Sequence, residues 1–275
     1  MKIGCFTLPF RAFPLEQALE AIAASGFRHV GIWPTHAEKP LFEPKAGEDG
    51  KVAAVRRAIE AADLKPTVLF GQHQPLDEAQ WEAFAIKLEQ AAALGCSELL
   101  AWGPWPWKEF HVAWLPEPEW KRLVDAFFTY LPRVAKQAEA AGVTVAYKPH
   151  CGVTAAAMEL KLLVERAGSP RIRASYDGGN VSFYEGLNPA EDIKLVAPLC
   201  HSLIVKDHKG GKGGREFPNV GLGEVDHKAM LAVLKAHGFA GPVSVEKLEG
   251  KTLEELAASA KHSCAVLERY AAELG

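Results

Sequence analysis

The sequence predicts an α/β fold and, within that class, a single (β/α)8 barrel, the TIM barrel. Short apolar runs alternate with longer amphipathic segments along all 275 residues. The runs are bounded by turn residues, which is typical of strands buried on both faces. Gly26, Gly95, Gly142 and Gly238 each end a helical pattern just before a strand-like run, where a left-handed helix terminus favours glycine. Eight such units in a chain of this length predict one barrel domain over residues 1–275.

The expected elements follow one another in strict alternation. The strands are the apolar runs at residues 2–6, 29–33, 67–70, 98–102, 143–147, 172–176, 202–205 and 243–246. The helices are the amphipathic segments at residues 15–24, 51–62, 77–94, 117–141, 155–167, 190–196, 227–236 and 253–274. An open doubly wound sheet is the alternative, but it usually has a glycine-rich turn after its first strand. This chain has Thr7-Leu8-Pro9-Phe10 there, which favours the closed barrel.

Composition limits the partners that the chain can have. Hydrophobic residues make up 48% of the chain, enough for a substantial core, and the net charge of −3 comes without a long basic run. A dominant nucleic-acid surface needs clustered Lys and Arg, so none is expected. No apolar run is long enough to cross a bilayer, and the amino terminus lacks a signal-peptide pattern. Five scattered cysteines without paired spacing indicate free thiols and a cytoplasmic protein.

Four expected strands are followed by side chains that bind metals or transfer protons. These residues are Lys148 and His150, Asp177 and Asn180, Lys206 and His208, and Glu246. In a barrel the carboxyl ends of the strands meet at one mouth, where such folds carry out chemistry. Carboxylates and imidazoles together suit a divalent ion such as Mn²⁺, Mg²⁺, Co²⁺ or Zn²⁺. The metal ligands expected from this pattern are His150, Asp177, His208 and Glu246.

Residues after the earlier strands extend the same mouth. They are Trp33 and His36 after the second strand, Gln72 and His73 after the third, and Trp102 at the end of the fourth. Tryptophan rings offer the flat apolar surface on which a sugar ring stacks. We therefore expect Trp33, His73, Trp102 and Asn180 to bind a substrate.

Each of these residues also has a structural interpretation. Asp177 can cap a helix or form a turn in Asp-Gly-Gly-Asn, and Glu246 can pair with Lys247 at the surface. A lone histidine most often makes a structural hydrogen bond. Lys148 can act as a base, an electrophile or an imine-forming amine, or it can be an ion-pair partner of Asp177 or Glu246. Their convergence on consecutive strands of one barrel favours a functional role.

With these residues and this order of elements, the chain resembles the xylose-isomerase-like barrel superfamily. That group contains sugar and sugar-phosphate isomerases and epimerases, inosose dehydratases, hydroxypyruvate isomerases and the endonuclease IV nucleases. The resemblance spans nearly the whole chain, and the segments that carry it are Met1-Lys2-Ile3-Gly4, residues 18–31, residues 142–180, Val205-Lys206-Asp207, residues 221–226 and Ser244-Val245-Glu246.

The resemblance implies a divalent metal held by Glu, Asp, His and Glu from strands five to eight. The Asp matches Asp177 and the last Glu matches Glu246, but the first Glu falls on Lys148 and the His falls on Ile204. Either the metal persists with displaced ligands, or the metal is lost and Lys148 supplies positive charge in its place. A divalent ion stabilises an enediolate more readily than an ammonium group, which favours a displaced metal site.

Together, the strand-end residues and the resemblance predict a sugar or keto-sugar isomerase or epimerase, or a related dehydratase or lyase. The expected reaction is proton abstraction next to a carbonyl, assisted by a divalent metal ion at the mouth. The expected catalytic residues are Lys148, Lys206 and Glu246, with both lysines stabilising the oxyanion. The alternatives are a metal-free lyase or aldolase in which Lys148 forms an imine, and a non-catalytic sugar-binding barrel. The expected partner is a small sugar-like molecule, and a homodimer is an option because barrels of this type often pair.

Overall fold

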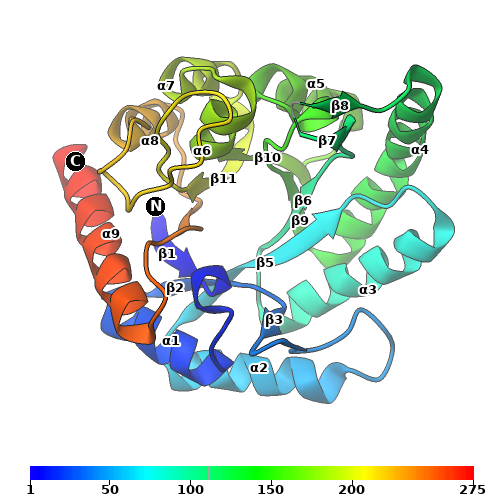
Figure 1. The fold of residues 1–275 in the computed structure, drawn as a ribbon. Coiled ribbons are helices and arrows are strands. Elements are labelled where there is room, and N and C mark those ends of the chain that lie inside the picture. Colours follow the sequence, from blue (N-terminus) through cyan, green and yellow to red (C-terminus); the bar gives the residue numbers. More distant parts are fainter. Residues whose placement is uncertain (111) are drawn as a thin grey trace.

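A computed structural model of the chain describes residues 1–110 and 112–275, in which eight parallel strands form a closed barrel (Figure 1). The barrel strands are β1 (Lys2–Phe6), β2 (His29–Ile32), β5 (Lys65–His73), β6 (Glu98–Trp102), β9 (Thr144–Tyr147), β10 (Ile172–Asp177), β11 (Cys200–Val205) and β12 (Pro242–Val245). Each strand pairs with its predecessor and successor among them, and β1 closes the ring against β12. The predicted barrel fold is confirmed.

The helices lie outside the ring of strands, as Figure 1 shows. They are α1 (Leu15–Ala24), α2 (Asp49–Ala61), α3 (Glu78–Leu94), α4 (Glu117–Ala141), α5 (Ala157–Ala167), α6 (Gly178–Asn180), α7 (Pro189–Asp192), α8 (His227–Ala236) and α9 (Leu253–Glu273). The last helix, α9, packs beside the first, α1, which joins the two ends of the chain into one wall. Among the described residues, no helix combines the length and the apolar character needed to cross a membrane.

Two details of the structure differ from the expected elements. The helix expected at residues 190–196 is shorter, because α7 gives way to the 3-10 turns Ile193–Leu195 and Ala197–Leu199. Two small hairpins were not expected, and they are β3 (Thr35–His36) with β4 (Lys39–Pro40), and β7 (Trp107–Glu109) with β8 (Ala113–Trp114). Both hairpins sit in loops that follow barrel strands, β2 and β6 respectively.

The apolar core has two parts. The larger part fills the layer between the strands and the helices. The smaller part lies inside the barrel, with Trp33 and Trp102 packed against it, and consists of Phe6, Val68, Phe70, Leu100 and Ile204. This inner cluster forms an apolar floor beneath the mouth at the carboxyl ends of the strands.

A carboxyl group is buried at the opposite, amino-terminal end of β6. Glu98 has no solvent exposure, and its Oε1 accepts a hydrogen bond from the Ser202 hydroxyl at 2.9 Å. Its Oε2 has no hydrogen-bond partner in the described part of the chain. Burial raises the pKa of Glu98 from 4.5 to about 8, so the folded protein holds a proton there at neutral pH.

The raised pKa of Glu98 should make the stability of the protein depend on pH, and replacing Glu98 with Gln should remove that dependence. Because the folded pKa is raised, the folded state binds a proton that the unfolded chain releases, and stability falls as pH rises from about 4.5 to about 8. At about pH 9, Glu98→Gln should therefore have an unfolding free energy roughly 2–4 kcal/mol above that of the unmodified protein, with little difference at about pH 4.5. Urea unfolding across this pH range measures it. Glu82→Gln, at an exposed position of α3, is the control and should follow the unmodified protein. Parallel pH curves for Glu98→Gln and the unmodified protein would contradict the account.

Candidate functional site

Two lysines and two carboxylates meet at the mouth of the barrel. Lys148 Nζ lies 2.6 Å from Glu246 Oε1 and 3.1 Å from Asp177 Oδ2. Lys206 Nζ lies 2.5 Å from Glu246 Oε2 and 3.1 Å from the same Asp177 oxygen. All four residues are at most 8% exposed. We call this cluster of Lys148, Asp177, Lys206 and Glu246 the charge quartet, in which two positive charges balance two negative ones.

The ends of four neighbouring strands position the quartet. Asp177 ends β10, while Lys148, Lys206 and Glu246 directly follow β9, β11 and β12. The parallel register keeps these ends level, since Asp177 pairs with Ile204 and the Glu246 N–H donates to the carbonyl of Val205 at 2.8 Å. Four side chains from adjacent strands therefore reach one place with little adjustment of the backbone.

The Asp-Gly-Gly-Asn segment is shaped by the lysine that passes over it. A Cβ atom at Gly179 would lie 2.5 Å from Lys206 Cγ and 2.7 Å from its carbonyl oxygen, so only glycine fits. Asp177 Oδ1 accepts a hydrogen bond from the Asn180 N–H at 2.9 Å, while its Oδ2 faces the two lysines. Asp177 is therefore both the cap of α6 and a member of the quartet.

Mutual attraction outweighs burial in the quartet. Burial alone would raise the pKa of Glu246, but the charges of Lys148 and Lys206 hold it well below its ordinary value. Burial alone would lower the pKa of Lys206, but Asp177 and Glu246 raise it above its ordinary value. Glu246 is accordingly a weak base, and Lys206 stays an ammonium group at neutral pH.

A cavity of about 390 Å³ lies over the quartet. Its lining residues are Leu8, Trp33, Phe70, Trp102, Lys148, His150, Asn180, Phe183, Tyr184, Lys206, Phe217, Glu246 and Lys247. Phe70 packs edge-on between Trp33 and Trp102, with ring centroids 4.7 Å and 5.7 Å apart. The mouth is thus a pocket with aromatic walls and charged groups at its base, of a size suited to a small molecule.

His150 and Tyr184 lie side by side in the wall of this cavity. The Tyr184 hydroxyl is 3.4 Å from His150 Nε2, and the His150 ring stacks on Trp105 with centroids 4.9 Å apart. Burial, with the charges of Lys148 and Lys206, lowers the pKa of His150 well below 6.5. Burial raises the pKa of Tyr184 to about 12. At neutral pH the pair consists of a neutral imidazole and an intact phenol.

Other expected site residues are engaged elsewhere. His208 is fully buried, and its Nε2–H donates to the Gly214 carbonyl at 2.6 Å while Nδ1 accepts from the Ser182 hydroxyl at 2.8 Å. His73 Nδ1–H donates to the Gly103 carbonyl at 3.0 Å and its Nε2 accepts the indole N–H of Trp102 at 3.0 Å. Both histidines therefore hold neighbouring structure, His73 by fixing the Trp102 ring.

Three of the remaining expected residues line the cavity, and one is held elsewhere by hydrogen bonds. Trp33, Trp102 and Asn180 line the cavity, and the Asn180 amide also donates to the Pro149 carbonyl at 2.6 Å. His36 is buried, with Nδ1–H donating to the Phe13 carbonyl at 3.0 Å and Nε2 accepting from the Thr7 hydroxyl at 2.9 Å. The side chain of Gln72 lies outside what the structure describes.

Comparison with known proteins places this barrel in a family. A model of the xylose isomerase-like TIM barrel matches residues 19–270. The chain belongs to the xylose isomerase-like TIM barrel family. No curated protein sequence gives a significant match.

Solved structures share the fold at low identity. A 3-keto-D-glucoside 4-epimerase, YcjR, from E. coli has a TM-score of 0.77 and 17% identity, covering 98% of this chain and 99% of that one. A D-tagatose 3-epimerase-like protein has a TM-score of 0.76 and 17% identity, covering 100% and 98%. An IOLI protein with a bound zinc atom has a TM-score of 0.72 and 17% identity, also covering 100% and 98%. At these identities the likeness establishes the fold.

The residues present do not fit the divalent metal that the family resemblance implies. Lys148 brings an ammonium group to the place of the first Glu, and Ile204, in the place of the His, is buried in the apolar floor beside Phe70. His208 does not join Asp177 and Glu246 as expected, because Ser182 and Gly214 hold it. Among residues 1–110 and 112–275, no group of three His, Cys, Asp or Glu side chains could hold a metal. The ammonium groups occupy the carboxylate oxygens that a metal would need.

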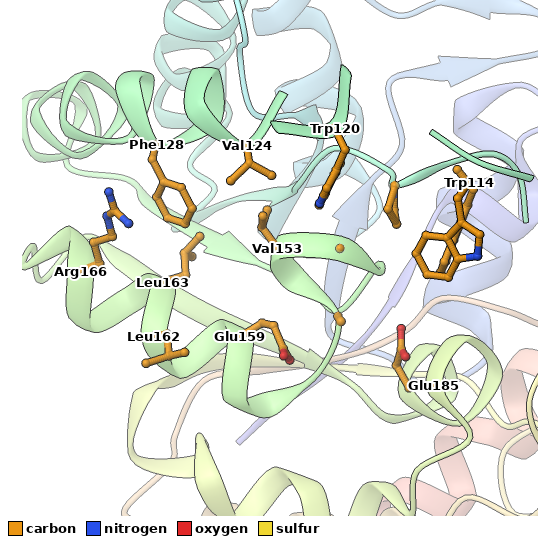
Figure 2. A pocket seen from close by; sticks show the side chains of 14 residues that line it. Trp114, Trp120, Val124, Phe128, Val153, Glu159, Leu162, Leu163, Arg166 and Glu185 are labelled. Carbon is orange, nitrogen blue, oxygen red and sulfur yellow. The ribbon is translucent and has the colours of Figure 1, made fainter. Parts of the chain in front are cut away.

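A larger cavity, of about 760 Å³, lies away from the quartet between α4, α5 and the β7–β8 hairpin. Figure 2 shows Val124 and Phe128 of α4 opposite Leu163 of α5, so its walls are mainly apolar. Its polar groups serve the local structure, since Arg166 packs over the Phe128 ring at 4.0 Å and Glu159 accepts the Ala156 N–H at 3.1 Å. The buried charged side chains of the quartet lie instead at the barrel mouth.

Sequence reasoning missed several lining residues. Phe183 and Tyr184 come from the turn after α6, Phe217 from the glycine-rich loop after β11, and Lys247 from the residue after Glu246. The aromatic pair that follows Asp-Gly-Gly-Asn after two further residues is a signal that could have indicated the first two. No sequence signal indicated Phe217, because its position depends on how a long loop folds back.

The quartet should behave as one coupled unit. Lys206→Met leaves two buried carboxylates with a single ammonium group, and should lower the unfolding free energy by about 3 kcal/mol. Lys206→Met combined with Glu246→Gln restores neutrality, and should cost at least about 1 kcal/mol less than the sum of the two single changes. Urea unfolding of the four proteins measures the coupling. The exposed Lys194–Glu191 pair, 2.6 Å apart, is the control, where the same substitutions should couple by less than about 0.5 kcal/mol. Additive effects in the quartet would show that its members do not depend on one another.

Proposed function

We propose that this protein is a carbohydrate-acting enzyme that isomerises or epimerises a sugar by proton transfer next to a carbonyl, with lysine ammonium groups in place of a metal. The observation that carries the proposal is the charge quartet at the base of an aromatic-walled cavity of about 390 Å³. The epimerase names of two similar structures support the substrate class. The aromatic walls suit the apolar face of a sugar, and the charged base suits its oxygen atoms.

Each part of the cavity has a role in this reaction. Trp33 and Trp102 pack against the sugar, and its carbonyl oxygen points toward Lys148 and Lys206. His150 takes the proton from the carbon next to the carbonyl, the electron pair of that C–H bond forms a C=C bond, and the carbonyl oxygen becomes an enolate oxygen. The ammonium groups stabilise this developing negative charge at fixed positions. The His150 imidazolium then returns the proton to the former carbonyl carbon. The hydroxyl on the adjacent carbon gives its proton to the Tyr184 phenol as that phenol gives its own to the enolate oxygen, and the deprotonated oxygen becomes the new carbonyl.

His150, the proton acceptor, and Tyr184, the hydroxyl that donates to the enolate oxygen, lie on one wall, which favours isomerisation over epimerisation. His150 and Tyr184 are 3.4 Å apart, so they reach the same face of a bound sugar. An aldose–ketose isomerisation needs proton transfer on one face only. Inversion at one carbon needs proton-transfer groups on both faces of the sugar. Glu246, the carboxylate that lines the cavity, is a poor proton acceptor because its pKa is held low, and as a carboxylate it has no proton to donate. Glu246 and Asp177 instead hold the ammonium groups in place.

The quartet also weighs against imine chemistry. An imine forms from an unprotonated amine, whereas Asp177 and Glu246 raise the pKa of Lys206 and contact Lys148 Nζ at 3.1 Å and 2.6 Å. The metal-free lyase or aldolase is therefore the second candidate. A lyase or aldolase of this kind would give a stable adduct at Lys148 after borohydride treatment with substrate.

Chelator-treated protein in D2O with a panel of aldoses and ketoses tests the proposal. We expect product that carries deuterium at the carbon next to the carbonyl, at a rate that EDTA does not change. Lys206→Met should lower kcat about 10²- to 10³-fold, because an oxyanion donor is lost. Lys136→Met, at an exposed position of α4, is the matched control. Activity that appears only after adding a divalent ion, or sugar binding without deuterium exchange, would refute the proposal.

The pH profile tests the His150–Tyr184 pair separately. His150 accepts a proton only when neutral, so kcat/KM should fall on the acid side with a midpoint below 6.5. The raised pKa of Tyr184, about 12, predicts no alkaline loss from this residue below about pH 11. His150→Asn should lose most activity and the acid limb together. An unchanged acid limb in His150→Asn would assign the titration to another group.

A further inference from the structure

A second cleft, of about 530 Å³, opens beside the mouth. It lies between the loop after β1 and the loop after β12, which contribute Pro9 and Arg11 on one side and Gly250 and Lys251 on the other. The cleft and the mouth share four lining residues, Leu8, Lys206, Glu246 and Lys247. The two cavities therefore adjoin along these four side chains, and a molecule seated over the quartet lies next to the cleft.

Positively charged side chains without an ion-pair partner distinguish this cleft within the described residues. Arg11, Lys247 and Lys251 line it, and within the described residues none of the three forms an ion pair with a carboxylate. Lys206 and Glu246 also line it, but they neutralise each other within the quartet. The cleft therefore has an excess of three positive charges in a protein whose net charge is −3.

Two acidic side chains close to Lys251 in the sequence bind backbone N–H groups. Glu255 Oε2 accepts the N–H groups of Lys251 at 2.7 Å and Thr252 at 3.1 Å. Glu249 Oε2 accepts the Asn219 N–H at 3.2 Å. Neither carboxylate lines the cleft, so neither takes the place of a bound anion there.

Lys247 connects the two cavities and is held in position. Its Nζ lies 3.7 Å from the centre of the Phe217 ring, a cation–π contact. Burial lowers the pKa of Lys247, and the charges of Lys206 and Arg11 act in the same direction, against the attraction of Glu246. A negative charge placed between Arg11 and Lys247 would relieve this repulsion.

We infer that the substrate carries an anionic group, a phosphate or a carboxylate, that binds between Arg11, Lys247 and Lys251 while the sugar carbonyl lies over the quartet. That the rest of the substrate is a sugar rests on the proposed function. An arginine and lysines around a concave site are the groups that proteins use for phosphate and carboxylate. The substrate class is then a sugar phosphate or a sugar acid in place of a neutral sugar.

Binding measurements test this inference without relying on turnover. The probes are inorganic phosphate, D-fructose 6-phosphate, D-gluconate and neutral D-fructose, each titrated by calorimetry at fixed ionic strength. We expect at least one anionic sugar to bind ten-fold or more tightly than D-fructose, and the preferred anion identifies phosphate or carboxylate. Arg11→Met and Lys247→Met should each weaken that binding about five- to ten-fold, while Arg11→Lys should recover part of it. Arg122→Met, at an exposed position of α4, is the control for charge and should change nothing.

The outcomes separate this inference from the proposed function. Equal affinity for neutral and anionic sugars, an anion preference that survives the double variant Arg11→Met/Lys247→Met, or no binding of any anionic probe at millimolar concentration would each overturn it. Anion-selective binding without deuterium exchange would leave this inference standing and refute the proposed reaction. Deuterium exchange confined to neutral sugars would support the proposed reaction and overturn this inference.

Discussion

The charge quartet is the interaction on which the rest of the site depends. Four buried charges are tolerated only when each has a partner at close range, because the cost of removing an ion from water is large. Lys148 and Lys206 each meet both carboxylates, so no member depends on a single contact. The arrangement requires the ends of β9, β10, β11 and β12 to stay level, and the closed barrel supplies that alignment. The geometry of the mouth thus follows from the register of the strands.

The quartet also explains how this member of the family can differ from the metal sites implied by the resemblance. Asp177 and Glu246 keep two carboxylates at the mouth, and these need nearby positive charge. With Lys148 in the place of one acidic ligand, positive charge is covalently attached to the barrel. Ile204, in the place of the histidine, then packs into the inner apolar cluster, where an unused imidazole would be an unpaired polar group. The two departures are consistent with each other, since both suit an ammonium-filled site and neither suits a metal.

The sequence predicted the barrel and the strand ends well, because both follow from periodicity and from glycine positions. The four members of the quartet were all identified, each by its place after an apolar run. Their mutual contacts could not be predicted, since Lys148 and Glu246 are 98 residues apart and their distance depends on the closed ring. His208 was misjudged because strand parity ends at Asp207, whose carboxylate accepts four backbone N–H groups and turns the chain. His150 did reach the cavity, although Cys151 beside it has a positive φ of 68°.

The glycine-rich loop after β11 links these features. Asp207 gathers the N–H groups of Gly221, Gly223 and Val225, and a Cβ atom at Gly223 would lie 2.1 Å from its Oδ1. His208 fixes the other side of the loop through Gly214. The loop held in this way carries Phe217 to the mouth, where its ring supports Lys247. His208, which the strand-end pattern marked as reactive, therefore acts indirectly: together with Asp207 it holds the loop that forms this wall of the mouth. Because that wall is held by hydrogen bonds to the protein itself, its position does not require a bound metal.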